Sequence, residues 1–308
     1  MVLGVNLTNH QVLIGKDEWL FLKNDTNQLI RQITGEVTVS DSLINHWSNT
    51  LKLRLSFFRA RKISYTYICA PNKECVYDKY LPDNIVLSEK RPIGIFRPVF
   101  ENILEDSFCY PLKELQNGII YTFSKGDTHW NQYGAFIAYE ALMKSMGVDN
   151  KINIEDVDFI SVKRKGDLMS KVSDTLLDDT VVAKIKNSSS IEIEFDNHVR
   201  NRGKLVVINN SKALNDDTLV IFRDSFGSAL IHFLARTFRR VVAVWQPNID
   251  IGIIEIESPQ YVVSEQVERF MISPPNDISD KTHNQICASK KCLRNITRLF
   301  EHLSFDII

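Results

Sequence analysis

The segment "TLVIFRDSFGSALIHF" (residues 218–233) runs from an apolar, β-branched stretch through Asp224 and Ser225 into an amphipathic pattern. These patterns are typical of a buried strand and a helix, so the segment predicts a strand, a tight turn and a helix. A serine at such a corner projects its hydroxyl outward, and the amides that begin the helix can bind an oxyanion. Asp and Ser are also preferred N-cap residues, so a purely capping role is the alternative.

A second segment, "GDTHWNQYGAFIAY" (126–139), places Asp127 and His129 two residues apart. In extended backbone, residues i and i+2 point to the same side, so this carboxylate can orient the imidazole. An imidazole held in this way can take the proton of a serine hydroxyl, which is otherwise a weak nucleophile. The sequence therefore suggests a triad of Ser225, His129 and Asp127. A local Asp–His contact that only stabilises a loop is the alternative.

The composition sets limits on the protein's class and partners. The chain has 308 residues, 44% of them hydrophobic, and a net charge of -1, which predicts a globular protein with no global field to attract nucleic acid. The five cysteines are scattered, so we expect neither a disulfide framework nor a metal site. The first residues lack the basic and apolar regions of a signal peptide. A cytoplasmic location is expected, or a periplasmic one if a leader has been removed.

The remaining pattern predicts an α/β fold with a parallel sheet flanked by helices. Short buried strands are expected at "SYTYICAP", "NGIIYTFS", "DTLVIF", "VVAVW" and "QYVVSEQV", and helices at residues 41–62, 131–146 and 225–239. Within a single domain spanning 1–308, residues 150–212 read as a β-rich insertion and residues 277–308 as a C-terminal helical extension. Functional residues of such sheets gather beyond the carboxyl ends of the strands, where we place the triad.

Six segments, in this order, resemble the alginate O-acetyltransferase-like SGNH hydrolases of the AlgX/AlgJ type. They are "GKDEWLFL" (15–22), "APNKECVYDKYLPD" (70–83), "DTHWNQYGA" (127–135), "GDL" (166–168), "FRDSFGSAL" (222–230) and "PQYVVSEQVERF" (259–270). The chain departs from the family pattern at Glu18 and at Arg223, where a glycine is usual. The resemblance implies an SGNH-hydrolase-like fold in circularly permuted order, because the serine follows the Asp/His pair instead of preceding it.

The resemblance also implies a function and further site residues. Ser225 would be the nucleophile, His129 the base and Asp127 its orienter, with the Ser225 amide as an oxyanion donor. The candidates for substrate binding, each with a packing role as the alternative, lie at or near strand ends: Lys73, Trp130, Arg223 and Arg269.

The implied activity is O-acetyl transfer to a hydroxyl of a bacterial surface saccharide, in a capsule, an exopolysaccharide or its precursor. We expect no bound cofactor, and acetyl-CoA is the expected donor. If the protein is exported, a membrane partner would donate the acetyl group. Two alternatives stay open: an O-acetylesterase that uses the same triad, and a non-catalytic module that binds or assembles saccharides.

Overall fold

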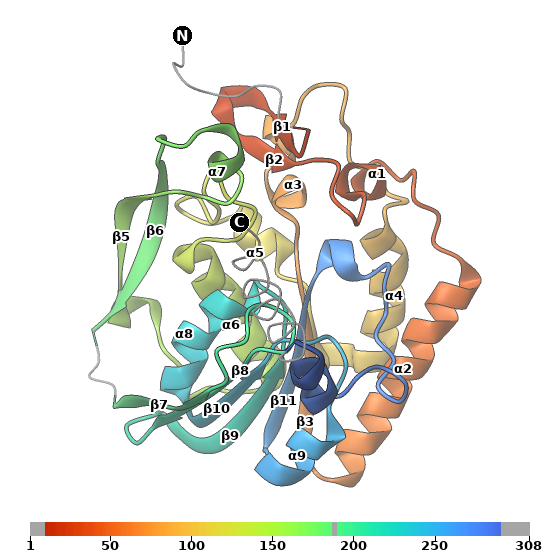
Figure 1. The fold of residues 1–308 in the computed structure, drawn as a ribbon, viewed down its shortest axis with the longest axis vertical. Coiled ribbons are helices and arrows are strands. Elements are labelled where there is room, and N and C mark those ends of the chain that lie inside the picture. The colour runs from red at the N-terminus through yellow and green to blue at the C-terminus, as the bar shows by residue number, and fades with distance from the viewer. Residues whose placement is uncertain (1–9, 187–189, 291–308) are drawn as a thin grey trace, which may run out of the picture.

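The computed structural model describes residues 10–186 and 190–290, and its centre is a seven-stranded sheet (Figure 1). The strand order is β4-β3-β11-β9-β10-β8-β7, and the first five strands run parallel to one another. These five are β3 (Ser64–Ala70), β4 (Phe108–Cys109), β9 (Asn215–Phe222), β10 (Phe238–Val244) and β11 (Tyr261–Val267). The predicted parallel sheet is therefore confirmed.

Helices cover both faces of this sheet, because its central strands are apolar on both sides. On one face, α6 (Gln132–Met146) and α8 (Gly227–Thr237) pack on alternate residues of β3, β9 and β10. On the other face, α2 (Asp41–Ala60) and α4 (Pro92–Leu104) pack on the intervening residues. Continuous apolar strands are typical of a sheet buried in this way.

Two of the predicted helices begin on clear local signals, and one of them also ends on one. Helix α2 begins after Ser40, whose hydroxyl accepts a hydrogen bond from the Leu43 amide at 3.2 Å. Helix α6 begins after Asn131, whose side chain accepts from the Gly134 amide, and it ends at Gly147. Gly147 has a φ of 68°, the left-handed conformation that favours glycine at a helix end. The described residues also contain α1 (Leu29–Ile33), α3 (Lys73–Val76), α5 (Leu112–Gln116), α7 (Met169–Val172) and α9 (Ile251–Glu257).

The strand predicted at "NGIIYTFS" (117–124) is wrong. This segment is a loop in which Ile119 is 92% exposed, and the edge strand of the sheet is instead the short β4. The loop's amides bind side chains rather than a neighbouring strand: the Thr122 amide donates to the Tyr77 hydroxyl and the Ile119 amide to the Tyr133 hydroxyl. Asp127 and His129 therefore follow a loop, not a strand.

Residues 150–212 contain four strands that lie in two different sheets. Strands β5 (Val157–Arg164) and β6 (Asp178–Ile185) pair with each other as a separate antiparallel sheet. Strands β7 (Ile191–Asp196) and β8 (Leu205–Asn210) are antiparallel, as their alternating sequence predicts, and β8 pairs with β10 of the central sheet. A second two-stranded sheet joins β1 (Val12–Ile14) to β2 (Leu20–Leu22). Most of the predicted C-terminal extension, residues 291–308, lies outside the described residues.

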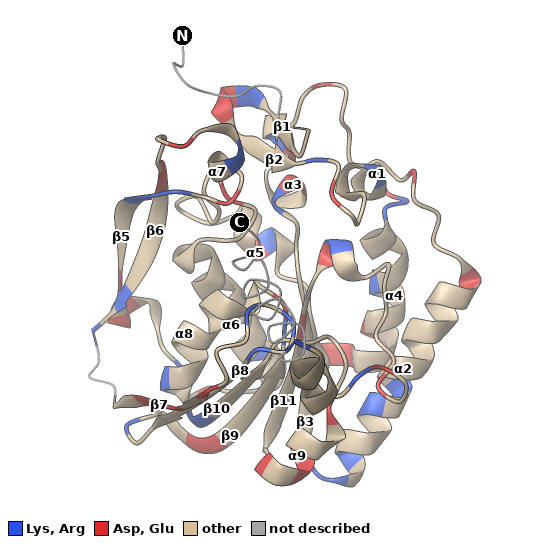
Figure 2. Ribbon diagram, in the orientation of Figure 1, with Lys and Arg blue, Asp and Glu red and all other residues tan. Residues whose placement is uncertain are grey.

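Basic and acidic residues both occur throughout the described elements (Figure 2). Within the described residues, no helix combines the length and the apolar character that a membrane span requires.

Candidate active site

Ser225 lies in the turn between the carboxyl end of β9 and the start of α8. Two buried carboxyl groups bind the amides around it. Glu265 Oε2 accepts from the amides of Asp224 (3.0 Å) and Gly227 (2.9 Å), and Asp224 Oδ1 accepts from the Phe226 amide (2.8 Å). Among the described residues, the Ser225 amide has no hydrogen-bond partner. The turn is thus held by its neighbours, and the Ser225 amide is left as a donor for an oxyanion.

Gly227 is required by the close packing of this turn. A Cβ atom at this position would lie 2.7 Å from Arg223 Cβ and 2.9 Å from Glu265 Oε2. Any larger residue would push the glutamate away from the two amides that it binds. The glycine of "RDSFG" therefore keeps the buried carboxyl in contact with the turn.

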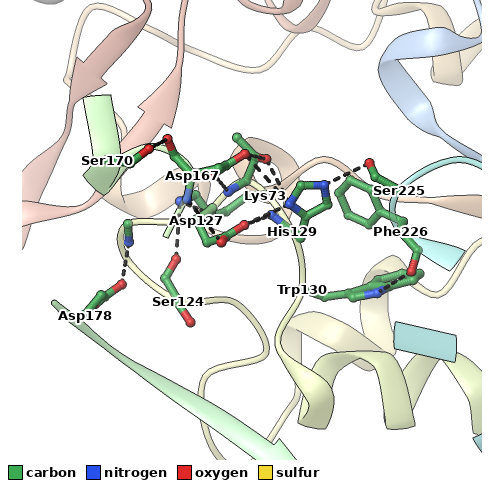
Figure 3. A network of polar contacts seen from close by, with 12 residues as sticks. Lys73, Ser124, Asp127, His129, Trp130, Asp167, Ser170, Asp178, Ser225 and Phe226 are labelled. Atoms are coloured by element: carbon green, nitrogen blue, oxygen red, sulfur yellow. Dashed lines mark hydrogen bonds and ion pairs between the residues drawn. The ribbon is translucent and has the colours of Figure 1, made fainter. Parts of the chain in front are cut away.

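Ser225, His129 and Asp127 form one continuous line of hydrogen bonds (Figure 3). Nε2 of His129 lies 2.8 Å from Oγ of Ser225, and Nδ1 lies 2.9 Å from Oδ1 of Asp127. The same carboxylate oxygen accepts from the His129 amide at 2.8 Å, which fixes the two residues relative to each other. The structure therefore brings together the three residues that the sequence predicts for the triad. Neither Ser225 nor Asp224 caps the start of α8 with its side chain, so neither has the capping role that was the alternative.

The electrostatics of the pair favour a charged imidazole. Burial disfavours that charge, but the hydrogen bond and the negative charge of Asp127 outweigh it, so the pKa of His129 is raised above its ordinary value. Burial likewise opposes ionisation of Asp127, yet its contacts with His129 outweigh burial and hold the pKa of Asp127 below its ordinary value. An imidazole that is stabilised when protonated is what a general base needs as it accepts a serine proton.

A second acid, Asp167, lies beside the pair, and sequence reasoning did not place it in the site. Its carboxylate accepts from the Thr128 amide at 2.7 Å and from the Thr128 hydroxyl, and one oxygen is 3.8 Å from His129 Nδ1. The sequence signal that could have identified Asp167 was the "GDL" segment, in which Gly166 precedes it. A Cβ atom on Gly166 would lie 2.1 Å from the Gly126 carbonyl oxygen, so only glycine allows the two segments to approach each other here.

These acids and the imidazole also offer ligand atoms to a cation. One atom each of Asp127, His129 and Asp167 lies within 4.8 Å of the others. Each of these groups is already bound by a partner on the protein: Asp127 by His129, and Asp167 by Thr128. The arrangement is that of a hydrogen-bonded acid–imidazole cluster, and the absence of a metal site stays a prediction.

The four candidates for substrate binding are all buried, and each contacts protein groups. Trp130 donates from Nε1 to the Phe226 carbonyl at 3.1 Å, which ties the His129 loop to the start of α8. The guanidinium of Arg223 lies 4.2 Å from the centre of the Trp245 ring, and burial lowers the pKa of Arg223 to about 10. The ammonium of Lys73 binds the loop that carries Asp127.

Arg269 is the one of these four whose charge acts on the imidazole. Its guanidinium lies 5.5 Å from the centre of the Phe226 ring and donates to Oδ1 of Asn72 at 3.2 Å. Its positive charge works against protonation of His129. Contact between substrate and any of these four side chains stays a prediction.

Comparisons with known proteins agree with this fold. The sequence of residues 12–205, more than half of the chain, matches the family described as "SGNH hydrolase-like domain, acetyltransferase AlgX". Ser225 lies beyond the matched residues. No curated protein sequence matches the chain.

Solved structures of similar fold share little sequence with this chain. Bacillus cereus PatB1 aligns with a TM-score of 0.63 and 16% identity over 86% of this chain and 97% of its own. The O-acetyltransferase domain of Pseudomonas putida AlgJ aligns with a TM-score of 0.56 and 16% identity over 88% of this chain and 95% of its own. A DHHW family protein from Eubacterium siraeum aligns with a TM-score of 0.60 and 15% identity over 90% of this chain and 96% of its own.

The central, mostly parallel sheet with helices on both faces and the family match define an SGNH-hydrolase-like α/β protein. The chain belongs to the SGNH hydrolase-like family of the acetyltransferase AlgX. Asp127 and His129 precede Ser225 along the chain, and β9 lies in the middle of the sheet between β10 and β11. The resemblance read from the six sequence segments is therefore confirmed.

Proposed function

We propose that the protein is an O-acetyltransferase that moves an acetyl group, by way of an acetyl-Ser225 intermediate, to a hydroxyl of a bacterial surface saccharide. The observation that carries the proposal is the line from Ser225 Oγ through His129 to Asp127, with distances of 2.8 and 2.9 Å. The family supports acetyl as the transferred group. The saccharide acceptor, in a capsule, an exopolysaccharide or its precursor, is proposed by analogy with that family.

The reaction follows from the positions of the atoms in two half-reactions. His129 Nε2 takes the Ser225 proton while Oγ attacks the acetyl carbonyl, and the negative charge that forms on the carbonyl oxygen meets the Ser225 amide. The leaving group takes the proton from His129 as its bond to the acetyl carbon breaks. A saccharide hydroxyl then gives its proton to His129 and attacks the acetyl-serine, and Ser225 recovers a proton from the imidazole.

The donor that we propose is acetyl-CoA, a thioester from which the thiol leaves as the acyl-enzyme forms, and this donor goes with a cytoplasmic location. A membrane partner that delivers the acetyl group is the alternative and goes with export to the periplasm. In both cases Ser225 receives the same acetyl group.

An O-acetylesterase is the second candidate, and the exposure of the site favours it. The side chains of His129 and Asp127 are 32% and 29% exposed, so water has access to the base that would activate it. An esterase and a transferase share the first half-reaction and differ in whether water or a hydroxyl attacks the acetyl-serine.

The deciding experiment follows an isotopically labelled acetyl group from acetyl-CoA, or from para-nitrophenyl acetate, in the presence of neutral and uronic oligosaccharides. Label on the oligosaccharide, detected by mass, supports the transferase. Label only in free acetate would replace it by the esterase. Labelling from the ester but not from acetyl-CoA would exclude acetyl-CoA as the donor.

A further inference from the structure

Lys73 is the first residue of α3, directly beyond the end of β3, and its side chain lies under the loop that carries Asp127 (Figure 3). The residue is only 1% exposed. Its ammonium donates to three carbonyl oxygens of one short loop: those of Ser124 (3.3 Å), Lys125 (2.9 Å) and Asp127 (2.6 Å). The three donors of one ammonium are thus matched to three acceptors of the segment 124–127.

A buried ammonium without a carboxylate partner is uncommon, because removing the charge from water is costly. Among the described residues, none of the ion pairs within 4.0 Å involves Lys73. The ring centres of Trp19 and Phe21 lie 5.8 and 5.4 Å from Nζ, within the range of cation–π contact. Burial lowers the pKa of Lys73 to about 8. The three loop carbonyls are therefore its main partners.

The loop that Lys73 holds is fixed from its other side as well. The Gly126 carbonyl accepts from the amides of Leu168 and Met169, and the Gly126 amide donates to Asp178 Oδ2. These contacts hold Gly126, whereas the shortest contact of Lys73 is with Asp127 itself. Lys73 thus binds the backbone of the residue whose carboxylate meets His129. Catalytic geometry tolerates little displacement: a shift of about 1 Å can slow a reaction a hundredfold.

We propose that Lys73 is a positioning residue: its ammonium binds the carbonyls of residues 124, 125 and 127 so that the Asp127 carboxylate meets Nδ1 of His129. The inference rests on the proposed function for its kinetic consequence. Its structural consequence, the contact between Asp127 and His129, is measurable without turnover.

The test compares Lys73→Met with Lys125→Met, a matched control in the same loop. Lys125 is half-buried, and its Nζ donates to the Asp17 carbonyl in an exposed contact, away from the triad. Acylation by para-nitrophenyl acetate is measured against pH, and the titration of the His129 imidazole is followed by NMR. The other charged groups that act on His129, Asp167 and Arg269, are unchanged in both variants.

For Lys73→Met we expect kcat to fall by about tenfold to a hundredfold with KM little changed. Because Asp127 raises the pKa of His129, its displacement lowers that pKa, and the acid limb of the rate profile moves to lower pH. Lys125→Met should leave both readouts at the wild-type values. Since a fall in stability alone does not change the pKa of His129, the titration separates positioning from folding.

A folded Lys73→Met variant with the wild-type titration of His129 would overturn the proposal. If that variant does not fold, Lys73→Gln replaces it. Its amide can still donate to two of the carbonyls, so we expect the titration of His129 to move in the same direction but by less, and an unmoved titration would overturn the proposal. If the wild type itself is not acylated, the proposed function fails, while the titration still decides the role of Lys73.

Discussion

Replacing Asp127 by Asn removes the negative charge beside His129 and keeps the shape of the side chain. Oδ1 of Asp127 accepts two hydrogen bonds from His129, at 2.8 and 2.9 Å, whereas Oδ2 accepts only one, from the Asp167 amide at 3.3 Å. The amide oxygen of Asn therefore takes the place of Oδ1, where two donors face it. His129 then keeps the proton on Nδ1, and Nε2 remains free to act as the base.

The expected loss is the electrostatic part of the acid's contribution. Two unit charges 4 Å apart near a protein surface attract by about 4 kcal/mol. Both side chains are about a third exposed, and solvent screening reduces this to roughly 3 kcal/mol. At about 1.36 kcal/mol for each factor of ten, the acylation rate falls by about a hundredfold. An imidazole in the wrong tautomer would lose about ten-thousandfold instead.

The assay is single-turnover acylation by para-nitrophenyl acetate over the pH range in which His129 titrates. Because Asp127 raises the pKa of His129, the variant's imidazole stays neutral to lower pH, and its acid limb moves to lower pH while the plateau falls. A loss of less than tenfold with an unmoved acid limb would refute the electrostatic contribution of Asp127. A fall in the acylation rate of about ten-thousandfold would refute the inference that the Asn oxygen keeps the proton of His129 on Nδ1.

Three further predictions concern the turn, the base and the scaffold. In the wild type, the raised pKa of His129 means that the acylation rate falls as the pH drops through a pKa above about 6.5. Burial and the nearby Asp224 raise the pKa of Glu265 well above its ordinary value. A Glu265→Gln variant keeps an acceptor for the Asp224 and Gly227 amides. This variant should therefore be acylated nearly as fast as the wild type. Glu265→Ala leaves two buried amides without an acceptor, at a cost in folding free energy of about 1–3 kcal/mol each. Thermal unfolding and the acylation rate should both show the loss. Equal losses in the Gln and Ala variants would contradict this prediction. Ser40→Ala removes the cap of α2 and should lower the free energy of unfolding by about 1 kcal/mol without changing the rate, which denaturant titration measures.

The triad was predictable because its signals are local. Asp127 and His129 lie two residues apart, and Ser225 follows an unmistakable buried strand and precedes an amphipathic helix. Residues 96 positions apart in the chain were expected at one place because the carboxyl ends of parallel strands meet at one edge of the sheet. That argument holds for Ser225, whereas Asp127 and His129 reach the site from a loop and not from the expected strand.

The roles of Lys73 and Glu265 were not predictable, because each binds backbone groups of a distant segment. The carbonyls that Lys73 binds lie 51 to 54 residues away, and the amides that Glu265 binds lie 38 and 41 residues away. The residue types in a sequence do not indicate which backbone carbonyls or amides a distant side chain will bind. A prediction that assigns roles from residue types therefore misses such contacts. The strand predicted at "NGIIYTFS" was wrong for a related reason. An apolar run in the sequence does not reveal that the hydroxyls of Tyr77 and Tyr133 will bind its amides.

The central claim is that Ser225 carries the acetyl group, and the mass of the intact protein tests it most directly. Wild type, Ser225→Ala and Ser258→Ala are incubated with acetyl-CoA or para-nitrophenyl acetate; Ser258 is an exposed control serine whose hydroxyl binds the Glu255 carbonyl. We predict one acetyl increment on the wild type and on Ser258→Ala, located on Ser225 by peptide mapping, and none on Ser225→Ala. An equal increment on Ser225→Ala, or none on the folded wild type with either donor, would contradict the account.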